Sequence, residues 1–411
     1  MKDRNLTVSV DDAIKIILES ITPLGPEDVH IMDLPGRVLF DPIIADKPVP
    51  PWNDSAMDGY AIVAEDSKGA SRNNPVKLRI IGEVQAGNFS RTAVGRGTAI
   101  RIMTGAPVPD NADCIIKIED TEEDSGYVKI LCEMAQYDNF RFAGESIGKG
   151  DIVLDKGERL RAAHMGVLAS LNCSRARVYK QPNVAIIATG NEIVDLGQDI
   201  TDGQIRNINA YTLIAETKKY GASPSYLGIA RDVYHETRQI FETALKADVI
   251  ISTGGVSMGK YDLVKDIYQE IGVAIKFGWV RVKPGRPFTF GTKGDKLVFG
   301  LPGNPVSTLT SFIQFVRPAL LSLMGARRIH KPVVNAILEE DIVKERGKAH
   351  FLRGQFTIKN NNFYVSTTGN QKSSVVRSMS DANCLMMIPE DLTTMKAGEP
   401  VRIQLINHDE V

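Results

Sequence analysis

The spacing of hydrophobic and polar residues divides the chain into segments with different expected structures. Over residues 9–20 apolar positions recur at helical spacing, and Ser9 with Asp12 resembles a capping box, so an amphipathic helix is expected. Between residues 46 and 150 the apolar runs are short and β-prone, with Gly, Asn, Asp and Pro between them. The clearest runs are 76–84, 98–103 and 127–131. This pattern predicts a β domain over 46–150.

The next segment, residues 151–182, starts like a strand and continues as a helix over 162–171. It ends in a basic stretch, 175–180. We expect it to pack beside the N-terminal helix, so that residues 1–45 and 151–182 form one discontinuous domain.

Strand-like and helical runs alternate regularly over residues 183–328. Strands are expected at 184–188, 225–229, 249–252, 274–282 and 296–299, and helices at 209–220, 233–246, 261–271 and 305–324. Such alternation predicts βαβ units and a doubly wound, mostly parallel sheet with both faces covered. Short alternating runs over 329–411 predict a small C-terminal β domain.

Composition and charge narrow the class of protein. The chain has 411 residues, 43% of them hydrophobic and 24% charged, and a formal net charge of -1, so no basic excess indicates nucleic acid or an anionic membrane. The four cysteines form no C-x-x-C pair and the six histidines show no metal-ligand spacing, which argues against disulfides and zinc. Neither a signal peptide nor an apolar run of about 18 residues is evident. A cytoplasmic protein is expected.

Glycine-rich polar loops follow four expected strands of the α/β domain. The loops are Thr189-Gly190-Asn191-Glu192, Thr253-Gly254-Gly255-Val256-Ser257-Met258-Gly259, Lys283-Pro284-Gly285-Arg286-Pro287 and Gly300-Leu301-Pro302-Gly303-Asn304-Pro305-Val306-Ser307. Taken singly, each is explained equally well as a tight turn that needs glycine. Ligands bind at the carboxyl ends of parallel strands, and backbone N–H groups, Lys283, Arg286 and the Ser307 hydroxyl can all bind an anion there. The four loops together predict an anion-binding site.

Carboxylates accompany these donors at Glu192, Asp232 and Asp262. Acids beside phosphate donors repel the substrate unless a hard cation such as Mg²⁺ bridges them, so metal-assisted phosphoanhydride chemistry is the natural inference. For Asp232 and Asp262 a helix-cap or first-turn role is the competing interpretation. The loops match neither a Walker A sequence nor a dinucleotide fingerprint, which weakens kinase and dehydrogenase interpretations.

The β domain contains two turn-rich strings. Residues 51–61 include Asp58, and residues 102–109 include Thr104. Local physics describes both as turns. The stretch from Trp52 to Tyr60 is equally consistent with a packed aromatic lid.

Taken in order, these strings resemble the MoeA family, the molybdopterin molybdenumtransferases, which are similar to the gephyrin E domain. The resemblance covers nearly the whole chain. It is carried by the four loops above and by Ser55-Ala56-Met57-Asp58-Gly59-Tyr60, Thr104-Gly105-Ala106-Pro107 with Asp113 and Glu119, Gly144-Glu145, and Ser257-x-Gly259-x-x-Asp262.

The resemblance implies an activity and a fold. The activity is insertion of molybdate into the dithiolene of adenylated molybdopterin, with Mg²⁺-dependent cleavage of the adenylate and release of AMP. The fold is a four-domain chain in an elongated homodimer, in which Asp58 and Thr104 reach the α/β site of the other subunit. The enzyme that adenylates molybdopterin is a further expected partner, whereas nucleic acid and membrane are not.

The resemblance also assigns roles to individual residues. Glu192, Asp232 and Asp262 would serve the metal and the phosphoanhydride, and the Thr253–Gly255 turn would hold phosphate. The residues expected at molybdate are Lys283, Ser307, Arg353, and Ser373 or Ser374. Tungstate would satisfy the same donors.

Three residues depart from the family pattern. Ser146 stands where Asp is frequent, Trp279 where Lys is frequent, and Arg286 replaces the second lysine of Lys-Pro-Gly-Lys-Pro. Trp279 would either stack on the pterin or belong to the core, and a diverged paralogue would show similar changes. The alternatives are a molybdopterin adenylyltransferase or pyrophosphate-cleaving hydrolase, and a non-enzymatic scaffold. The intact acids and cations favour chemistry.

Overall fold

The computed structural model describes residues 7–255 and 263–406. Internal contacts divide the chain into two compact units. The first consists of Met1–Phe40, Gly157–Arg161 and Ala176–Val411, and the second of Asp41–Lys156 and Ala162–Arg175. The N-terminal helix, the α/β sheet and the C-terminal β domain therefore belong to one unit.

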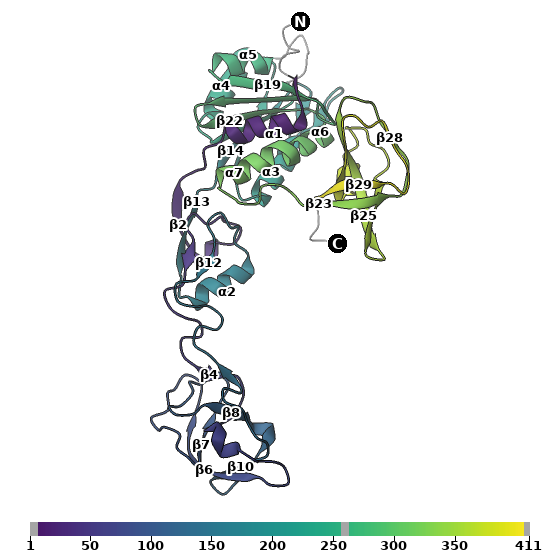
Figure 1. The fold of residues 1–411 in the computed structure, drawn as a ribbon. Coiled ribbons are helices and arrows are strands. Elements are labelled where there is room, and N and C mark those ends of the chain that lie inside the picture. The colour runs from purple at the N-terminus through teal and green to yellow at the C-terminus, as the bar shows by residue number, and fades with distance from the viewer. Residues whose placement is uncertain (1–6, 256–262, 407–411) are drawn as a thin grey trace. The chain divides into compact units, whose positions relative to one another are not determined.

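A seven-stranded sheet forms the centre of the first unit (Figure 1). In spatial order its strands are β1 (Thr7–Val8), β19 (Ala274–Val280), β21 (Pro287–Lys293), β22 (Lys296–Leu301), β18 (Val249–Thr253), β14 (Asn183–Thr189) and β17 (Ser223–Ala230). Only β21 is antiparallel to its neighbours, β19 and β22. The predicted mostly parallel sheet is confirmed, and the carboxyl ends of β14, β17, β18, β19 and β22 share one edge.

Strand β21 was not among the expected strands. It forms a hairpin with β22, in which Lys293 pairs with Lys296 and Gly294-Asp295 makes the turn. Gly294 has φ +56°, as such two-residue turns require. The Gly-Asp pair between two apolar runs was the available sequence signal.

Helices cover both faces of this sheet, as predicted. Val184 and Ile186 of β14 belong to one hydrophobic cluster, whereas Ala185 and Ile187 belong to another. The first cluster includes residues of α1 (Val10–Glu19), α3 (Asn209–Lys219), α6 (Pro305–Ser311), the π-helical segment Phe312–Val316 and α7 (Arg317–Leu323). The second includes residues of α4 (Tyr234–Ala244) and α5 (Leu263–Glu270). Burial on both faces explains why the strands read as continuous apolar runs.

One described helix, Pro305–Leu323, is long and apolar enough to cross a membrane. Of the window that meets this criterion, 89% is buried inside the protein. Its hydrophobicity is accounted for by packing against the sheet.

The N-terminal helix forms as predicted but packs elsewhere. Ser9 caps α1 by accepting the Asp12 N–H at 3.1 Å. Ala13 and Ile17 lie in the core of the α/β sheet, so the expectation that α1 packs beside residues 151–182 is wrong. The reason is β1, which pairs with β19 at the sheet edge and directs the following helix onto the sheet.

Residues 151–182 instead contact the chain that follows α1. Strand β12 (Ile152–Leu154) pairs with β3 (Ile43–Ile44), and β13 (Arg175–Tyr179) pairs with β2 (Pro26–His30). Helix α2 (Ala162–Ser170) belongs to the second unit.

The predicted β domain is a six-stranded sheet within the second unit. Its spatial order is β8 (Cys114–Lys117), β5 (Gly59–Ile62), β7 (Thr98–Ile102), β6 (Val76–Val84), β10 (Tyr127–Ile130) and β9 (Thr121–Asp124). A separate ladder joins β4 (Asp54–Ser55) to β11 (Phe140–Arg141). Tyr60 is buried in the core of this sheet, which excludes it from a surface lid.

The C-terminal β domain is a second six-stranded sheet. Its order is β20 (Val282–Lys283), β25 (Ala349–Lys359), β26 (Asn362–Thr367), β23 (Val333–Leu338), β29 (Pro400–Leu405) and β27 (Cys384–Ile388), and β27 also pairs with β25, closing a small barrel. Strand β20 comes from the α/β domain and places Lys283 opposite His350. The barrel is thereby attached to a predicted site loop.

Replacing Phe288 by Ala is expected to destabilise the first unit by about 3–5 kcal/mol, because a large aromatic side chain would leave a cavity. Phe288 is fully buried, and its ring lies 4.6 Å from that of Phe315 and 5.9 Å from that of Phe277, centroid to centroid. Urea unfolding measures the loss. Phe89→Ala, at a ring that is 64% exposed, should cost far less, and equal losses in the two variants would contradict the expectation.

Candidate functional site

The shared edge of the α/β sheet borders a cleft of about 720 Å³. Three of the four predicted loops, those after β14, β18 and β22, line it together with the Asp232 loop after β17. Of the predicted Lys283 loop, only Pro287 lines this cleft. The predicted residues found in its lining are Thr189, Gly190, Glu192, Asp232, Thr253, Gly254, Gly255, Pro302, Gly303, Asn304, Ser307 and Ser374. We call this the acidic cleft after Glu192 and Asp232, the two acids in a lining that also includes Arg206 and Arg231.

Hydrogen bonds join the loop after β14, which carries Glu192, to the segment that carries Asp232. Asn191 Oδ1 accepts the N–H of Asp232 at 3.0 Å, and the guanidinium of Arg231 donates to the Asn191 carbonyl at 3.2 Å. Gly190 has φ +129°, and a Cβ there would lie 2.5 Å from a carboxylate oxygen of Glu192. The positive φ favours glycine at this position, and the carboxylate of Glu192 lies against it.

An amide that the sequence did not single out links two of the predicted loops. Asn209 Nδ2 donates to Thr253 Oγ1 and to the Gly303 carbonyl, both at 2.7 Å. Thr253 Oγ1 in turn donates to the carbonyl of Pro302 at 3.2 Å. The Thr253 hydroxyl thus holds loops together, and Asn209 was missed because its partners are 44 and 94 residues away.

The Thr-Gly-Gly turn packs closely against the end of β14. Thr189 Oγ1 donates to the Thr253 carbonyl at 3.1 Å. A Cβ on Gly254, whose φ is +91°, would lie 2.7 Å from Thr189 Oγ1. The Gly254 N–H donates to Leu301, so it is occupied within the sheet. The predicted phosphate contacts of this turn would therefore have to come from polar groups of the turn other than the Gly254 N–H.

A second cleft, of about 1230 Å³, lies between the Lys283 loop and the C-terminal barrel. The predicted residues in its lining are Lys283, Pro284, Gly285, Asn304, Ser307, Arg353, Ser373 and Ser374. We call this the basic cleft, because six Lys or Arg residues line it against three acids, Glu340, Asp341 and Glu345. No described carboxylate forms an ion pair with Lys283, Arg286 or Lys372. Asn304, Ser307 and Ser374 line both clefts, which therefore adjoin.

Arg353 lies at the basic cleft but is fully buried. Its guanidinium donates to Ser378 Oγ at 3.1 Å and to the carbonyls of Asn370 and Lys372 at 3.2 and 3.3 Å. Burial lowers the pKa of Arg353 to about 10, which leaves it charged at neutral pH. In this structure Arg353 holds the segment that leads to Ser373 and Ser374.

His350 is a cleft residue that the sequence did not indicate. Its side chain is 3% exposed, and Nε2 has no hydrogen-bond partner among the described residues. Burial, with Lys344, Lys283 and Lys348 nearby, lowers the pKa of His350 to about 4. The imidazole is therefore neutral at physiological pH. Its backbone lies opposite that of Lys283 in the pairing of β20 with β25, two strands that are far apart in the sequence.

The stability of the first unit is expected to fall as pH drops from about 6.5 to 4. The folded state holds the pKa of His350 at about 4, below its ordinary 6.5, so the unfolded chain takes up a proton first and is favoured. The shift corresponds to roughly 3 kcal/mol at full effect. Urea unfolding at pH 7 and pH 4.5 measures the effect. Between these two pH values, the free energy of unfolding of His350→Gln should fall less than that of the unsubstituted protein. A parallel loss in both proteins would contradict this.

The predicted metal ligands are placed only in part. Glu192 and Asp232 share the acidic cleft, and their oxygen atoms are the ligands that Mg²⁺ prefers. Asp262, like Ser257, lies outside the described residues. Among the residues that are described, no three His, Cys, Asp or Glu side chains form a metal-binding group. The donor chemistry fits Mg²⁺, whose remaining positions would be filled by Asp262, the substrate or water.

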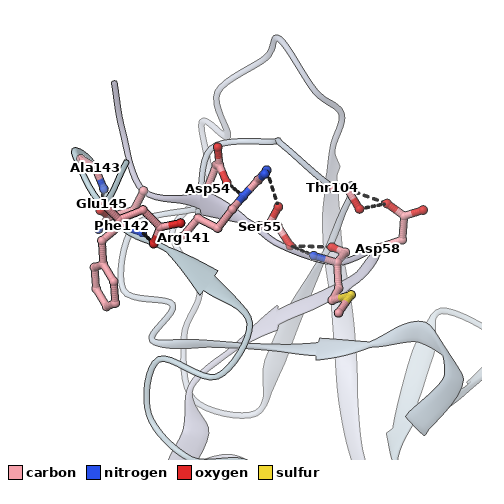
Figure 2. A network of polar contacts seen from close by, with 10 residues as sticks. Asp54, Ser55, Asp58, Thr104, Arg141, Phe142, Ala143 and Glu145 are labelled. Atoms are coloured by element: carbon pink, nitrogen blue, oxygen red, sulfur yellow. Dashed lines mark hydrogen bonds and ion pairs between the residues drawn. The ribbon is translucent and has the colours of Figure 1, made fainter. Parts of the chain in front are cut away.

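Asp58 and Thr104 form a pair in the β domain (Figure 2). The N–H and the hydroxyl of Thr104 both donate to Asp58 Oδ1 at 2.7 Å. These two bonds, the backbone one first, lower the pKa of the Asp58 carboxyl. Asp58 is exposed and Oδ1 takes both bonds, so Oδ2 is left toward solvent. The pair lies in the second unit, whereas both clefts lie in the first.

Arg141 and Ser55 brace the loops that carry this pair. Arg141 donates to Asp54 Oδ1 at 2.6 Å and to the Ser55 carbonyl at 3.2 Å. Ser55 Oγ donates to the Met57 carbonyl at 2.5 Å, beside Asp58 (Figure 2). The turn-rich string around Asp58 is therefore a fixed loop.

Known families and structures match the chain over nearly its full length. Three family models match in succession: the MoeA N-terminal region (domain I and II) over residues 8–172, a "probable molybdopterin binding domain" over 185–322, and the MoeA C-terminal region (domain IV) over 335–406. A molybdopterin molybdenumtransferase of Staphylococcus epidermidis is 33% identical over 404 residues, which is 98% of this chain and 96% of that protein. One from Staphylococcus aureus is 33% identical over 403 residues, with the same coverage.

Solved structures agree with these matches. A crystal structure of the molybdopterin biosynthesis moeA protein from Pyrococcus horikoshii OT3 superposes with a TM-score of 0.85 at 30% identity, covering 97% of this chain and all of that one. A second crystal structure from that organism gives 0.81 at 32% identity, covering 97% of this chain and 99% of that one.

Proposed function

Because the chain belongs to the MoeA family of molybdopterin molybdenumtransferases, transferases of molybdenum cofactor biosynthesis, we propose that it inserts molybdate into adenylated molybdopterin and releases AMP. The observation that carries the proposal is the adjoining pair of clefts. The acidic cleft suits a metal-bridged phosphoanhydride, and the basic cleft suits an oxyanion. Asn304, Ser307 and Ser374 border both, so one ligand can occupy the two at once.

In this proposal Glu192, Asp232 and Asp262 would hold Mg²⁺. The ion would neutralise the phosphoanhydride and stabilise the charge that develops on the departing AMP. Gly190 and Asn191 keep Glu192 and Asp232 on one wall, and Asn209 fixes the neighbouring loops. The protein's contribution is a preorganised arrangement of charges and donors.

Lys283, Ser307 and the Ser373-Ser374 segment would bind the oxyanion. A lysine and hydroxyl donors suit a tetrahedral dianion. Asn304 Nδ2 donates to Ser373 Oγ at 3.0 Å, and Arg353 orders the backbone just before it. Molybdate is proposed as the natural oxyanion, and tungstate would meet the same donors.

The proposal includes a cytoplasmic homodimer. Asp58 and Thr104 of one copy would complete the site of the other, and the exposed Asp58 carboxylate supports this role. The adenylated substrate implies an adenylyltransferase as a functional partner, because that activity must supply the phosphoanhydride.

The proposal is tested by incubating purified protein with adenylated molybdopterin, molybdate and Mg²⁺ and separating nucleotides by chromatography. AMP should appear only when both molybdate and Mg²⁺ are present. AMP release without molybdate would identify a pyrophosphate hydrolase. In a separate incubation with ATP and molybdopterin, formation of the adenylate would identify an adenylyltransferase. If the protein catalyses none of these reactions, a non-enzymatic scaffold is the remaining interpretation.

A further inference from the structure

Trp279 lies beside two cations at the edge of the α/β sheet. It is half-buried on β19, between Thr7 of β1 and Pro287 of β21. The guanidinium of Arg286 is centred 5.4 Å from the indole ring, and Lys265 Nζ lies 5.3 Å from it. Both distances fall within the range of cation–π attraction.

The hairpin between β19 and β21 produces the contact with Arg286. The Val280 N–H donates to the Arg286 carbonyl at 3.1 Å, which returns the chain to the level of Trp279. Arg286, which follows Lys283-Pro284-Gly285, therefore has its side chain next to the indole of Trp279. Neither cleft includes Trp279 in its lining, whereas the basic cleft includes Arg286.

The chemistry of arginine gives this contact a consequence. A guanidinium attracted to an aromatic ring keeps its N–H groups available, and their planar fork can bind two oxygens of one anion. Arg286 is exposed and forms no ion pair with a described carboxylate. Its N–H groups are therefore available to a ligand.

We propose that Arg286 binds an oxyanion in the basic cleft and that Trp279 is the positioning residue that holds its guanidinium in place. This rests on the proposed function, which supplies a tetrahedral oxyanion as substrate. The proposal also explains two departures from the family pattern together. Trp279 stands where the family frequently has lysine, and its indole ring holds the guanidinium of Arg286, which replaces the second lysine of Lys-Pro-Gly-Lys-Pro.

The test is a tungstate titration of the full chain. The chain has two tryptophans, so in a Trp52→Phe background Trp279 is the only one. Tungstate should change its fluorescence saturably, and calorimetry supplies the Kd. Arg286→Lys should weaken binding about fivefold, and Trp279→Leu should weaken it to a similar extent. The two changes combined should weaken it little more than either alone, because each removes the same contact.

Lys265→Ala is the matched control, because Lys265 lies over the same ring but lines neither cleft. It should leave the Kd for tungstate unchanged. Trp279→Phe, which keeps an aromatic face, should bind more tightly than Trp279→Leu, and circular dichroism checks that each variant is folded.

The proposal is overturned if folded Trp279→Leu binds tungstate like the parent, if Lys265→Ala weakens binding as much as Arg286→Lys does, or if the parent binds no tungstate. If the tungstate affinities are as predicted but no AMP is released from adenylated molybdopterin, the proposed reaction is wrong and the oxyanion site is still supported.

Discussion

Glu192→Gln is expected to lower kcat/KM for AMP release by roughly 10²- to 10³-fold. The amide keeps the size of the side chain but removes a negative charge that would bind Mg²⁺, which supplies several kcal/mol of transition-state stabilisation. The loop should survive the change, because its fixed contacts come from Gly190 and Asn191. Steady-state AMP formation over a range of Mg²⁺ concentrations measures the effect.

The control for Glu192 is Glu236→Gln. Glu236 is an exposed acid in the first turn of α4, close in sequence to Asp232, but it does not line the acidic cleft. It should retain parental activity. Full activity of Glu192→Gln, with an unchanged Mg²⁺ requirement, would remove Glu192 from the metal site.

Asp58→Asn is expected to be the second severe variant, with AMP release about 10²-fold slower, an effect of the size that single electrostatic groups supply in active sites. Asparagine can still accept the Thr104 bonds through its carbonyl oxygen, so the loop should remain folded. The carboxylate charge is what is lost. Asp124→Asn, at an exposed acid of β9 in the same domain, is the control.

Co-expression separates the action of Asp58 within a subunit from action across subunits. If Asp58 and Glu192 act at one site from different copies, mixed dimers of the two variants contain one intact site. Random pairing should then restore about one quarter of the parental activity. If the co-expressed mixture is as inactive as the two single variants, both residues act within the same subunit.

The sequence predicted which loops meet at the α/β edge, because the elements that build it are local. A strand followed by a glycine-rich loop is a short-range pattern, and parallel strands bring such loops to one edge whatever lies between them. Thr189, Thr253 and Gly303 therefore reached the same cleft as expected.

The parts that were missed depend on contacts between distant segments. An apolar stripe shows that α1 is amphipathic but does not identify the surface that it covers. The pairing of the two-residue strand β1 with β19 directs α1 onto the α/β sheet. Asn209 and His350 gain their roles from partners that only the fold brings near. Arg353 was expected at an oxyanion from the resemblance, and its observed bonds to backbone carbonyls could not be predicted from sequence spacing.

The most direct test of the account is to count two products in one reaction. Purified protein, adenylated molybdopterin, molybdate and Mg²⁺ are combined for a single turnover, and AMP is quantified together with molybdenum bound to the pterin. The account predicts equal amounts of both, lost together in Glu192→Gln. AMP without inserted molybdenum, or inserted molybdenum without AMP, would contradict it.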